Sequence, residues 1–264
     1  MDLGLKDKVA IVGGGSKGLG KGVALSLARE GVHIALVAND TQSLEETSHQ
    51  IKTETGVKVL PLNANLSEVS LIKSKIIQPV LETFSQIDIL FVNSGGPKPG
   101  SFFDTTTADW NNAYDSVLLY VVELYRQVIP VMQKQGWGRI INSTSLTVKQ
   151  PGPGMILSNV FRSAVVSLAK SISTELIKDG ITINNILPGA FKTDRAIELM
   201  QDRSDRTGET LAEIEALAVA NMPLGRYQTP DEYGDLVTYL ASESARGITG
   251  TSLQIDGGIL KHIF

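Results

Sequence analysis

The sequence contains no cysteine, and this absence excludes disulfide bonds, thiolate metal sites and a cysteine nucleophile. Histidine is scarce as well, since His33, His49 and His262 lie far apart and lack the spacing of metal ligands. No apolar run reaches the roughly 18 residues that a membrane-spanning helix needs. The segment from Met1 to Lys8 holds two aspartates and no apolar stretch typical of a signal peptide. We therefore expect a cytoplasmic protein without a metal site.

Positive charge is not in excess. The chain has 24 lysines and arginines against 28 acidic residues, which gives a formal net charge of −4. Binding to nucleic acid or to an anionic membrane depends on clustered basic residues, whereas the densest charged segment here, 202–206, alternates in sign. We therefore expect neither nucleic acid nor a membrane as the main partner, and we expect a small-molecule substrate instead.

Short apolar runs alternate with longer segments of helical periodicity along the chain, and no linker or repeat interrupts them. This alternation is typical of parallel βαβ units. The runs are rich in valine, isoleucine and leucine without strict polar alternation, which favours strands covered by helices on both faces. We predict a single α/β domain over residues 1–264, with a Rossmann-type doubly wound sheet of about seven parallel strands. The expected strands span residues 9–12, 33–38, 57–63, 87–93, 139–143, 182–187 and 252–255.

Two helix boundaries are marked in the sequence. Thr229 can cap a helix, Pro230 suits its first position, and Glu232 stands three residues after the cap, where a capping box needs it. Gly180 follows the end of an expected helix at 175–179 and can adopt the left-handed conformation in which many helices end. The sequence therefore predicts a helix start at Thr229 and a helix end at Gly180.

A glycine-rich segment, 13–20, joins the first expected strand to a helix-like segment, 21–30. Glycines allow the backbone to turn sharply and to approach a pyrophosphate closely. The N-terminus of the following helix offers free N–H groups and the positive end of its dipole. A glycine-rich turn alone is weak evidence, but its place between strand and helix of a βαβ unit predicts dinucleotide binding.

Gly14, Gly18 and Gly20 have the spacing of the glycine-rich loop in the short-chain dehydrogenase/reductase family, and the chain resembles this family over nearly its whole length. It is similar to 3-oxoacyl-carrier-protein-reductase-like members. The resemblance implies an NAD(P)(H)-dependent oxidoreductase that acts on a carbonyl/alcohol pair. Further motifs in the family's order carry the resemblance: Asn93-Ser94-Gly95, Leu187-Pro188-Gly189 with Thr193, Pro223-Leu224-Gly225-Arg226, Ile248-Thr249-Gly250 and Asp256-Gly257-Gly258.

The resemblance also implies which residues contact the dinucleotide. Asn65 replaces the aspartate that usually meets the adenine, and an amide there keeps an acceptor while adding a donor. The motif that contains Pro188 flanks the nicotinamide in similar proteins. The implied cofactor contacts are Gly14, Ser16, Lys17, Gly18, Leu19, Gly20, Asn39, Asn65, Leu66, Asn93, Gly95, Arg162, Pro188, Gly189 and Thr193.

The choice between NAD(H) and NADP(H) depends on the end of the second strand. The family's acid for the NAD ribose and its arginine for the NADP phosphate fall at Ala38 and Asn39, so both are missing. Lys17 lies in the glycine loop, where similar proteins meet the 2′-phosphate with a basic side chain, and it favours NADP(H). Two alternatives stay open: Lys17 points to solvent, or Asp40 turns inward and favours NAD(H).

The catalytic positions depart from the family pattern, in which an Asn, a Ser, a Tyr and a Lys carry the chemistry. The motifs downstream fix the register, which places Ser158 at the Tyr position and Arg162 at the Lys position. Ser145 keeps the family serine, and Val117 takes the Asn position. A serine hydroxyl is a poor acid beside a phenol of pKa about 10, and arginine stays protonated. We predict slow carbonyl reduction by Ser145, Ser158 and Arg162.

Three arrangements could restore proton transfer. Ser145 and Ser158 could hold a water as the proton donor, with Arg162 stabilising the developing oxyanion. Lys149 could supply the missing ammonium, although its neighbours favour a surface turn. A tyrosine could also reach in from the preceding helix, where ordinary packing is the simpler interpretation. These tyrosines are Tyr114, Tyr120 and Tyr125.

Two other functions stay open on the same residues. One is a catalytically silent dinucleotide-binding protein, either a sensor or a non-catalytic subunit, and the missing Tyr and Lys favour it. The other is non-redox chemistry, such as dehydration or isomerisation, on the same scaffold. All of these share the glycine loop, so only the catalytic positions discriminate among them.

The resemblance implies a substrate lid over residues 191–221, whose apolar spacing also fits ordinary core packing. Four residues after the Asn93-Ser94-Gly95 turn could line the same cleft, which would suit an apolar or medium-sized substrate: Pro97, Pro99, Phe102 and Phe103. The helical segments 110–132 and 155–176 are apolar on more than one face, so they need a covering surface. Together with the resemblance, this predicts a homotetramer or homodimer assembled through these two helices.

Overall fold

The computed structural model describes residues 2–261, so His262 lies outside it. Within these residues, seven strands form one parallel sheet in the order β3-β2-β1-β4-β5-β6-β7. The predicted doubly wound α/β fold is therefore confirmed. The third and fourth strands are shorter than predicted at their ends, and all seven lie where the apolar runs placed them. They are β1 (Val9–Gly13), β2 (His33–Ala38), β3 (Val59–Asn63), β4 (Ile89–Val92), β5 (Gly138–Ser143), β6 (Ile181–Pro188) and β7 (Ser252–Ile255).

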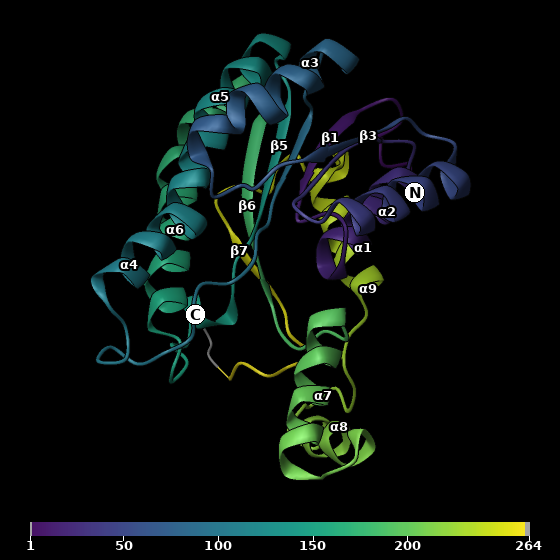
Figure 1. Ribbon diagram of the computed structural model, residues 1–264. Coiled ribbons are helices and arrows are strands. Elements are labelled where there is room, and N and C mark those ends of the chain that lie inside the picture. Colours follow the sequence, from purple (N-terminus) through teal and green to yellow (C-terminus); the bar gives the residue numbers. More distant parts are fainter. Residues whose placement is uncertain (1, 262–264) are drawn as a thin grey trace.

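Helices cover both faces of the sheet, which gives three layers (Figure 1). In β1, Ala10 and Val12 belong to the apolar core on one face, whereas Val9 and Ile11 belong to the core on the other. This explains why the runs lack polar alternation, since both faces of each central strand are buried. The first face carries α1 (Gly18–Arg29), α2 (Thr41–Thr55) and α9 (Pro230–Ala241), and the second carries α3 (Gln78–Phe84), α4 (Thr107–Ala113), α5 (Tyr120–Gln135) and α6 (Ile156–Leu176).

Both marked helix boundaries are confirmed. Thr229 caps α9, and the side chain of Glu232 returns a hydrogen bond to the Thr229 backbone N–H, which completes the capping box. A 3-10 turn, Ile177–Asp179, follows α6, and Gly180 ends it with φ of 74°. Only glycine adopts this backbone conformation at little cost, so the chain can turn there into β6.

The helical segment expected over 110–132 is interrupted. A π turn, Tyr114–Leu119, separates α4 from α5 and carries the buried Val117. Such turns insert an extra residue into the helical repeat, and hydrophobic periodicity does not reveal them. The π turn packs against α6, the helix that carries Ser158 and Arg162.

A buried polar chain fixes β5 against its neighbours. The Tyr125 hydroxyl of α5 donates to Asn142 Oδ1 at 2.8 Å, and Asn142 Nδ2 donates to Asn185 Oδ1 of β6 at 2.9 Å. Buried polar groups of this kind are stable only when they are hydrogen-bonded. The chain therefore holds β5 and β6 in one register and sets the position of Ser143, the last residue of β5.

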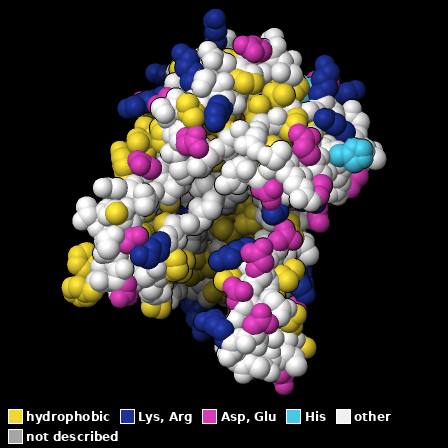
Figure 2. Space-filling view, viewed as in Figure 1, with side chains coloured by type: hydrophobic (Ala, Val, Ile, Leu, Met, Phe, Trp, Pro, Cys, Tyr) yellow, Lys and Arg dark blue, Asp and Glu magenta, His cyan; other side chains and the backbone are white. Residues whose placement is uncertain are grey.

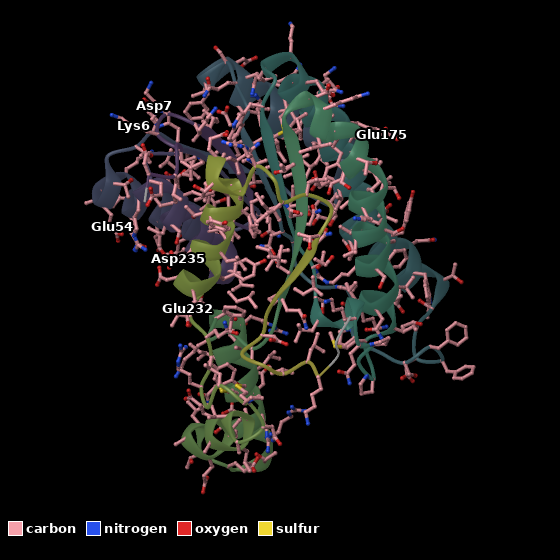
Figure 3. The ribbon with its side chains drawn as sticks, turned by 180° about the vertical axis from the view of Figure 1, so that it is seen from behind. Lys6, Asp7, Glu54, Glu175, Glu232 and Asp235 are labelled. Atoms are coloured by element: carbon pink, nitrogen blue, oxygen red, sulfur yellow. The ribbon has the colours of Figure 1, made fainter. Side chains whose placement is uncertain are left out.

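Two helices, α7 (Asp194–Thr207) and α8 (Leu211–Val219), extend beyond the carboxyl end of β6, away from the body of the protein (Figure 1). The chain then returns to α9, where Glu232 lies near the helix start (Figure 3). Glu232 forms an ion pair with Arg226 at 2.7 Å, which ties the returning segment to α9. No helix within residues 2–261 is long and apolar enough to cross a membrane.

Candidate functional site

The glycine-rich loop between β1 and α1 is packed tightly against itself and against the turn after β4. A Cβ atom added at Gly20 would overlap the carbonyl oxygen of Gly14, and one added at Gly13 would lie 2.7 Å from the carbonyl oxygen of Asn93. Asn93 Nδ2 also donates to the Gly13 carbonyl at 3.3 Å. Gly14 and Gly18 have φ of 58° and 53°, which glycine tolerates best. These contacts hold the loop in one shape at the N-terminus of α1.

A cavity of about 300 Å³ opens beside this loop, at the carboxyl ends of β1 to β4. It lies where the strand order reverses between β1 and β4, the position at which open α/β sheets bind ligands. The cavity lies next to the N-terminus of α1, where free backbone N–H groups can donate to phosphates, and this position fits a dinucleotide. Six of the predicted cofactor residues line it: Gly14, Ser16, Asn39, Asn65, Leu66 and Gly95.

The other predicted cofactor residues are absent from the lining of this cavity, and Arg162 lines a second one. Thr193 caps α7, and its side chain would lie 3.4 Å from a Cβ at Gly18, so the start of α7 contacts the loop. Leu19 packs against the core between α1 and the sheet. Pro188 ends β6, and Gly189 lies close to the backbone of Asp256. Their binding roles stay predictions.

Lys17 and Asp40 form an ion pair at the edge of this cavity, with Lys17 Nζ 2.8 Å from Asp40 Oδ2. Asp40 also caps α2 by accepting from the Ser43 N–H. The hydrogen bond from Lys17 is the largest of the effects that lower the pKa of Asp40, to about 2. Asp40 is thus engaged by Lys17 and by the helix N-terminus, while the neighbouring Asn39 lines the cavity.

Ser145, Ser158 and Arg162 line a second cavity of about 160 Å³. Ser158 and Arg162 lie four residues apart on α6, so they share one helix face. Ser145 caps a short 3-10 turn, Leu146–Val148, and its Oγ accepts from the Thr147 N–H at 3.1 Å. The Ser158 side chain has no hydrogen-bond partner within residues 2–261, although its residue is only 6% exposed. Its hydroxyl is therefore available to a molecule in the cavity.

The guanidinium of Arg162 is anchored on the backbone at the end of β5. Its Nη1 donates to the carbonyl oxygens of Ser143 and Thr144, each at 3.1 Å. Burial lowers the pKa of Arg162, while the nearby Tyr120 and Tyr233 oppose that shift. Arginine still stays charged, because its ordinary pKa is far above neutral. The site thus holds a fixed cation rather than a proton donor that titrates near neutral pH.

Two buried tyrosines, Tyr120 and Tyr233, lie near Arg162. Burial raises the pKa of both Tyr120 and Tyr233, so each stays neutral. Tyr233 donates from its hydroxyl to Ser143 Oγ at 2.9 Å. Tyr120 lines a small inner cavity together with Val117 and Arg162, and it does not line the cavity of Ser158. Sequence patterning missed Tyr233, because it lies on α9, far along the chain.

The remaining sequence alternatives for the missing acid/base are not supported by the geometry. Lys149 donates to Gln254 Oε1 at 3.2 Å and does not line the cavity of Ser158. Tyr114 stacks against Phe161 with ring centroids 6.3 Å apart. Tyr125 is committed to the buried chain through Asn142. Ser145 and Ser158 line one cavity, so the water-mediated arrangement stays a prediction that the lining is compatible with.

The expectation that Phe102 and Phe103 line the cleft is wrong, because these side chains are 61% and 93% exposed and absent from the cavity lining. Pro97 and Pro99 do line it, together with Lys98, which sequence patterning did not single out. The segment 96–100, called the strap below, is hydrogen-bonded to the residues just before α6. The Gly100 N–H donates to the Gly154 carbonyl at 2.7 Å. The glycines and prolines concentrated in residues 95–100 were the sequence signal available for this strap.

The two cavities adjoin, because Gly96 lines both of them. Figure 2 shows the surface hollowed between α7–α8 and the side that carries α4 and α6. No cluster of metal-ligating side chains occurs within the described residues 2–261. The arrangement is one long groove at the carboxyl edge of the sheet, with a phosphate-type loop at one end and a fixed cation with hydroxyls at the other.

The chain is similar to known proteins over nearly its whole length. Residues 14–260 match the family described as enoyl-(acyl carrier protein) reductase. A 3-oxoacyl-acyl-carrier-protein reductase of Staphylococcus epidermidis is 30% identical over 254 residues, which cover 96% of this chain and 99% of that protein. An uncharacterised oxidoreductase of Bacillus subtilis is 27% identical over the full length of both chains. L-sorbose reductase of Gluconobacter frateurii, solved with NADPH and L-sorbose, is 29% identical, with a TM-score of 0.95 and full coverage of both chains.

Proposed function

Because the chain belongs to the short-chain dehydrogenase/reductase family of NAD(P)-dependent oxidoreductases, we propose that it reduces a substrate carbonyl, or oxidises the corresponding alcohol, through Ser145, Ser158 and Arg162. The observation that carries this proposal is the convergence of these three residues on one cavity that adjoins the dinucleotide groove. Residues distant in the chain are brought together where hydride would be exchanged.

The groove fits a dinucleotide in two respects. Gly20 lies so close to the backbone of Gly14 that a side chain at position 20 would displace the glycine loop. A loop packed in this way can bring its backbone N–H groups close to a pyrophosphate. Gly14 and Ser16 would face the phosphates, Asn65 and Leu66 the adenine end, and Arg162 the nicotinamide ribose. When bound, the dinucleotide supplies or accepts the hydride, and the protein orients the substrate against it.

Proton transfer at this site runs through water. Ser145 and Ser158 can hold a water molecule against the substrate oxygen, and Arg162 stabilises the negative charge that develops there. A positioned acid/base contributes about 10²–10⁴-fold to the rate of such reactions. We therefore expect turnover slower than that of relatives with a tyrosine and a lysine at these positions.

Calorimetry with NADPH and NADH, followed by dinucleotide oxidation against a panel of carbonyl compounds, tests this function. We expect saturable binding and measurable turnover in the same sample. Binding without turnover would favour the silent sensor or non-catalytic subunit, and the absence of any dinucleotide binding would refute the proposal. Conversion of a substrate without any change in the dinucleotide would favour dehydration or isomerisation.

NADP(H) is the dinucleotide that the site favours, since Lys17 is the basic side chain next to the groove and is 56% exposed in its ion pair with Asp40. Exposed ion pairs are weak, so Lys17 can leave Asp40 for a 2′-phosphate. The L-sorbose reductase of Gluconobacter frateurii, a protein of the same fold, is complexed with NADPH, which supports the same choice.

Lys17→Glu should weaken NADPH binding by at least about tenfold and leave NADH binding nearly unchanged, because only NADPH carries the 2′-phosphate. Calorimetry with both dinucleotides measures the two affinities. Lys52→Glu makes the same charge change on the exposed last turn of α2 and serves as the control. Equal losses for NADPH and NADH would show that Lys17 does not recognise the phosphate.

We further propose that the chain is one domain whose segment 191–221 closes over the substrate. Apolar side chains of α7 and α8, among them Leu199 and Leu217, are half exposed, which suits helices that cover a bound molecule. Slower hydrogen exchange in α7 and α8 upon addition of NADPH and substrate would be the expected sign, and unchanged exchange would contradict it.

The faces of α5 and α6 point to assembly as a homotetramer or homodimer. An apolar depression between them is lined by Val122, Ile129 and Leu168, among others. Exposed apolar surfaces of this kind commonly mark interfaces. A monomer mass in sedimentation equilibrium would refute the assembly, and we expect the assembled protein in the cytoplasm.

A further inference from the structure

The cavity of Ser158 is positively charged, although the protein as a whole is acidic. Its charged lining residues are Lys98 and Arg162, and no aspartate or glutamate lines it. The formal charge of the whole chain is −4, so the two cations are a local exception. Lys98 lies on the strap, where it pairs with Asp109 at 3.0 Å. Arg162 lies deeper, on α6.

Arg162 lacks a counter-ion. Across residues 2–261 it forms no ion pair, and its hydrogen bonds go from Nη1 to two backbone carbonyls. Its Nε and Nη2 have no acceptor in the same part of the chain. A partly buried charge without a partner of opposite sign is unfavourable, because the surrounding protein replaces part of its hydration. An anion that enters the cavity would relieve this cost.

The free edge of the guanidinium also has a defined geometry. A guanidinium presents parallel N–H groups in one plane, which match the two oxygens of a carboxylate. Because Nη1 is fixed on the carbonyls of Ser143 and Thr144, the orientation of the whole planar group is set by the end of β5. A lysine in this place would offer a charge without this fork.

We propose that the substrate is a small 2-oxo acid, whose carboxylate binds Arg162 while its neighbouring carbonyl faces Ser145 and Ser158. This inference rests on the proposed function and specifies its substrate class. At about 160 Å³ the cavity is about half the volume of the one beside the glycine loop, which suits a short acid. Lys98, at the strap, lines the same cavity while it is paired with Asp109, so Arg162 carries the unpaired charge.

The reaction is balanced with water as the proton source. The carbonyl carbon gains a hydride from the reduced dinucleotide, and the electron pair of the C=O π bond moves to oxygen. That oxygen takes a proton from the water held by Ser145 and Ser158, and the products are a 2-hydroxy acid, the oxidised dinucleotide and hydroxide, which the solvent neutralises. Arg162 keeps its proton throughout and offsets the charge of the carboxylate.

The test uses oxamate, a 2-oxo acid mimic that is not reduced, and its neutral ester methyl oxamate. Both are titrated by calorimetry into the full chain saturated with NADPH. We expect saturable millimolar or tighter binding of oxamate, at least about tenfold tighter than that of the ester. Arg162→Met should abolish the preference for the charged ligand, and Lys149→Met, which removes a cation outside the cavity lining, should keep it.

Thermal melting and NADPH saturation check that each variant is folded and loaded. Equal binding of oxamate and its ester to the unchanged protein, or no binding of oxamate, would overturn the inference without any variant. Oxamate binding that survives Arg162→Met would overturn the role of Arg162. Turnover of neutral ketones without oxamate binding would refute the 2-oxo acid as the substrate and leave the proposed function intact. Oxamate binding without turnover of any carbonyl compound would support the 2-oxo acid site and refute the proposed function.

Discussion

Gly20→Ala should reduce the affinity for NADPH at least about 100-fold, which corresponds to about 2.7 kcal/mol. The added methyl group would overlap the carbonyl oxygen of Gly14, and its nearest neighbours are the backbone of Gly13 and Gly14 rather than a flexible side chain. The backbone of Gly13 and Gly14 cannot shift without changing the conformation of the glycine loop, which the hydrogen bond from Asn93 to the Gly13 carbonyl also holds. The first turn of α1 would then no longer present its N–H groups to the pyrophosphate.

Calorimetry with NADPH measures this loss, and circular dichroism shows whether the variant is folded. Gly247→Ala is the matched control, because a Cβ at Gly247 meets nothing within 4 Å and its φ is not positive. We expect the control to bind NADPH as the unchanged protein does. A folded Gly20→Ala protein with undiminished NADPH affinity would show that the dinucleotide does not rely on this loop.

Arg162→Ala should lower kcat/KM for carbonyl reduction by about 10²–10³-fold, the loss typical when one donor to a developing oxyanion is removed. Arg162 is the deeper of the two cations that line the cavity, and it stays charged because the ordinary pKa of arginine is far above neutral. Ser145→Ala should also reduce turnover, because it removes a hydroxyl that holds the water, but the loss should be smaller. The Arg162→Ala and Ser145→Ala variants together test whether this cavity is an active site.

Initial rates of NADPH oxidation with a converted carbonyl compound provide the measurement. Ser171→Ala serves as the control on the same helix, since the Ser171 hydroxyl is exposed and bonds only to the Ser167 carbonyl. Turnover that persists in both Arg162→Ala and Ser145→Ala would mean that the reaction takes place elsewhere, and the proposed site would have to be abandoned.

The architecture was predictable because it depends on short-range patterns. A strand covered on both faces reads as an apolar run, and β7 has the bounds that its run predicted. Thr229 and Gly180 mark helix ends through local backbone chemistry. The π turn was not predictable, since one extra residue in a helical repeat leaves the apolar pattern around Val117 nearly unchanged.

The candidate site was predictable in membership but not in contacts. Motif spacing placed Ser145, Ser158 and Arg162 together, and they do line one cavity. The partners of Arg162 are backbone carbonyls, which carry no sequence signal. The pair of Lys17 with Asp40 and the outward direction of Phe103 depend on loop conformation, which residue types alone do not determine.

The hydrogen bonds from Arg162 to the end of β5 couple position 162 to position 158. A lysine side chain is one bond shorter, so Arg162→Lys alone would lose the hydrogen bonds to the carbonyls of Ser143 and Thr144. Each buried group left without a partner costs about 1–3 kcal/mol. A tyrosine at position 158 alone would stand beside an arginine rather than the lysine that normally adjusts its acidity. Each single change toward the tyrosine and lysine of the family pattern is therefore disfavoured, so Ser158→Tyr and Arg162→Lys should be less unfavourable together than the sum of the two single changes.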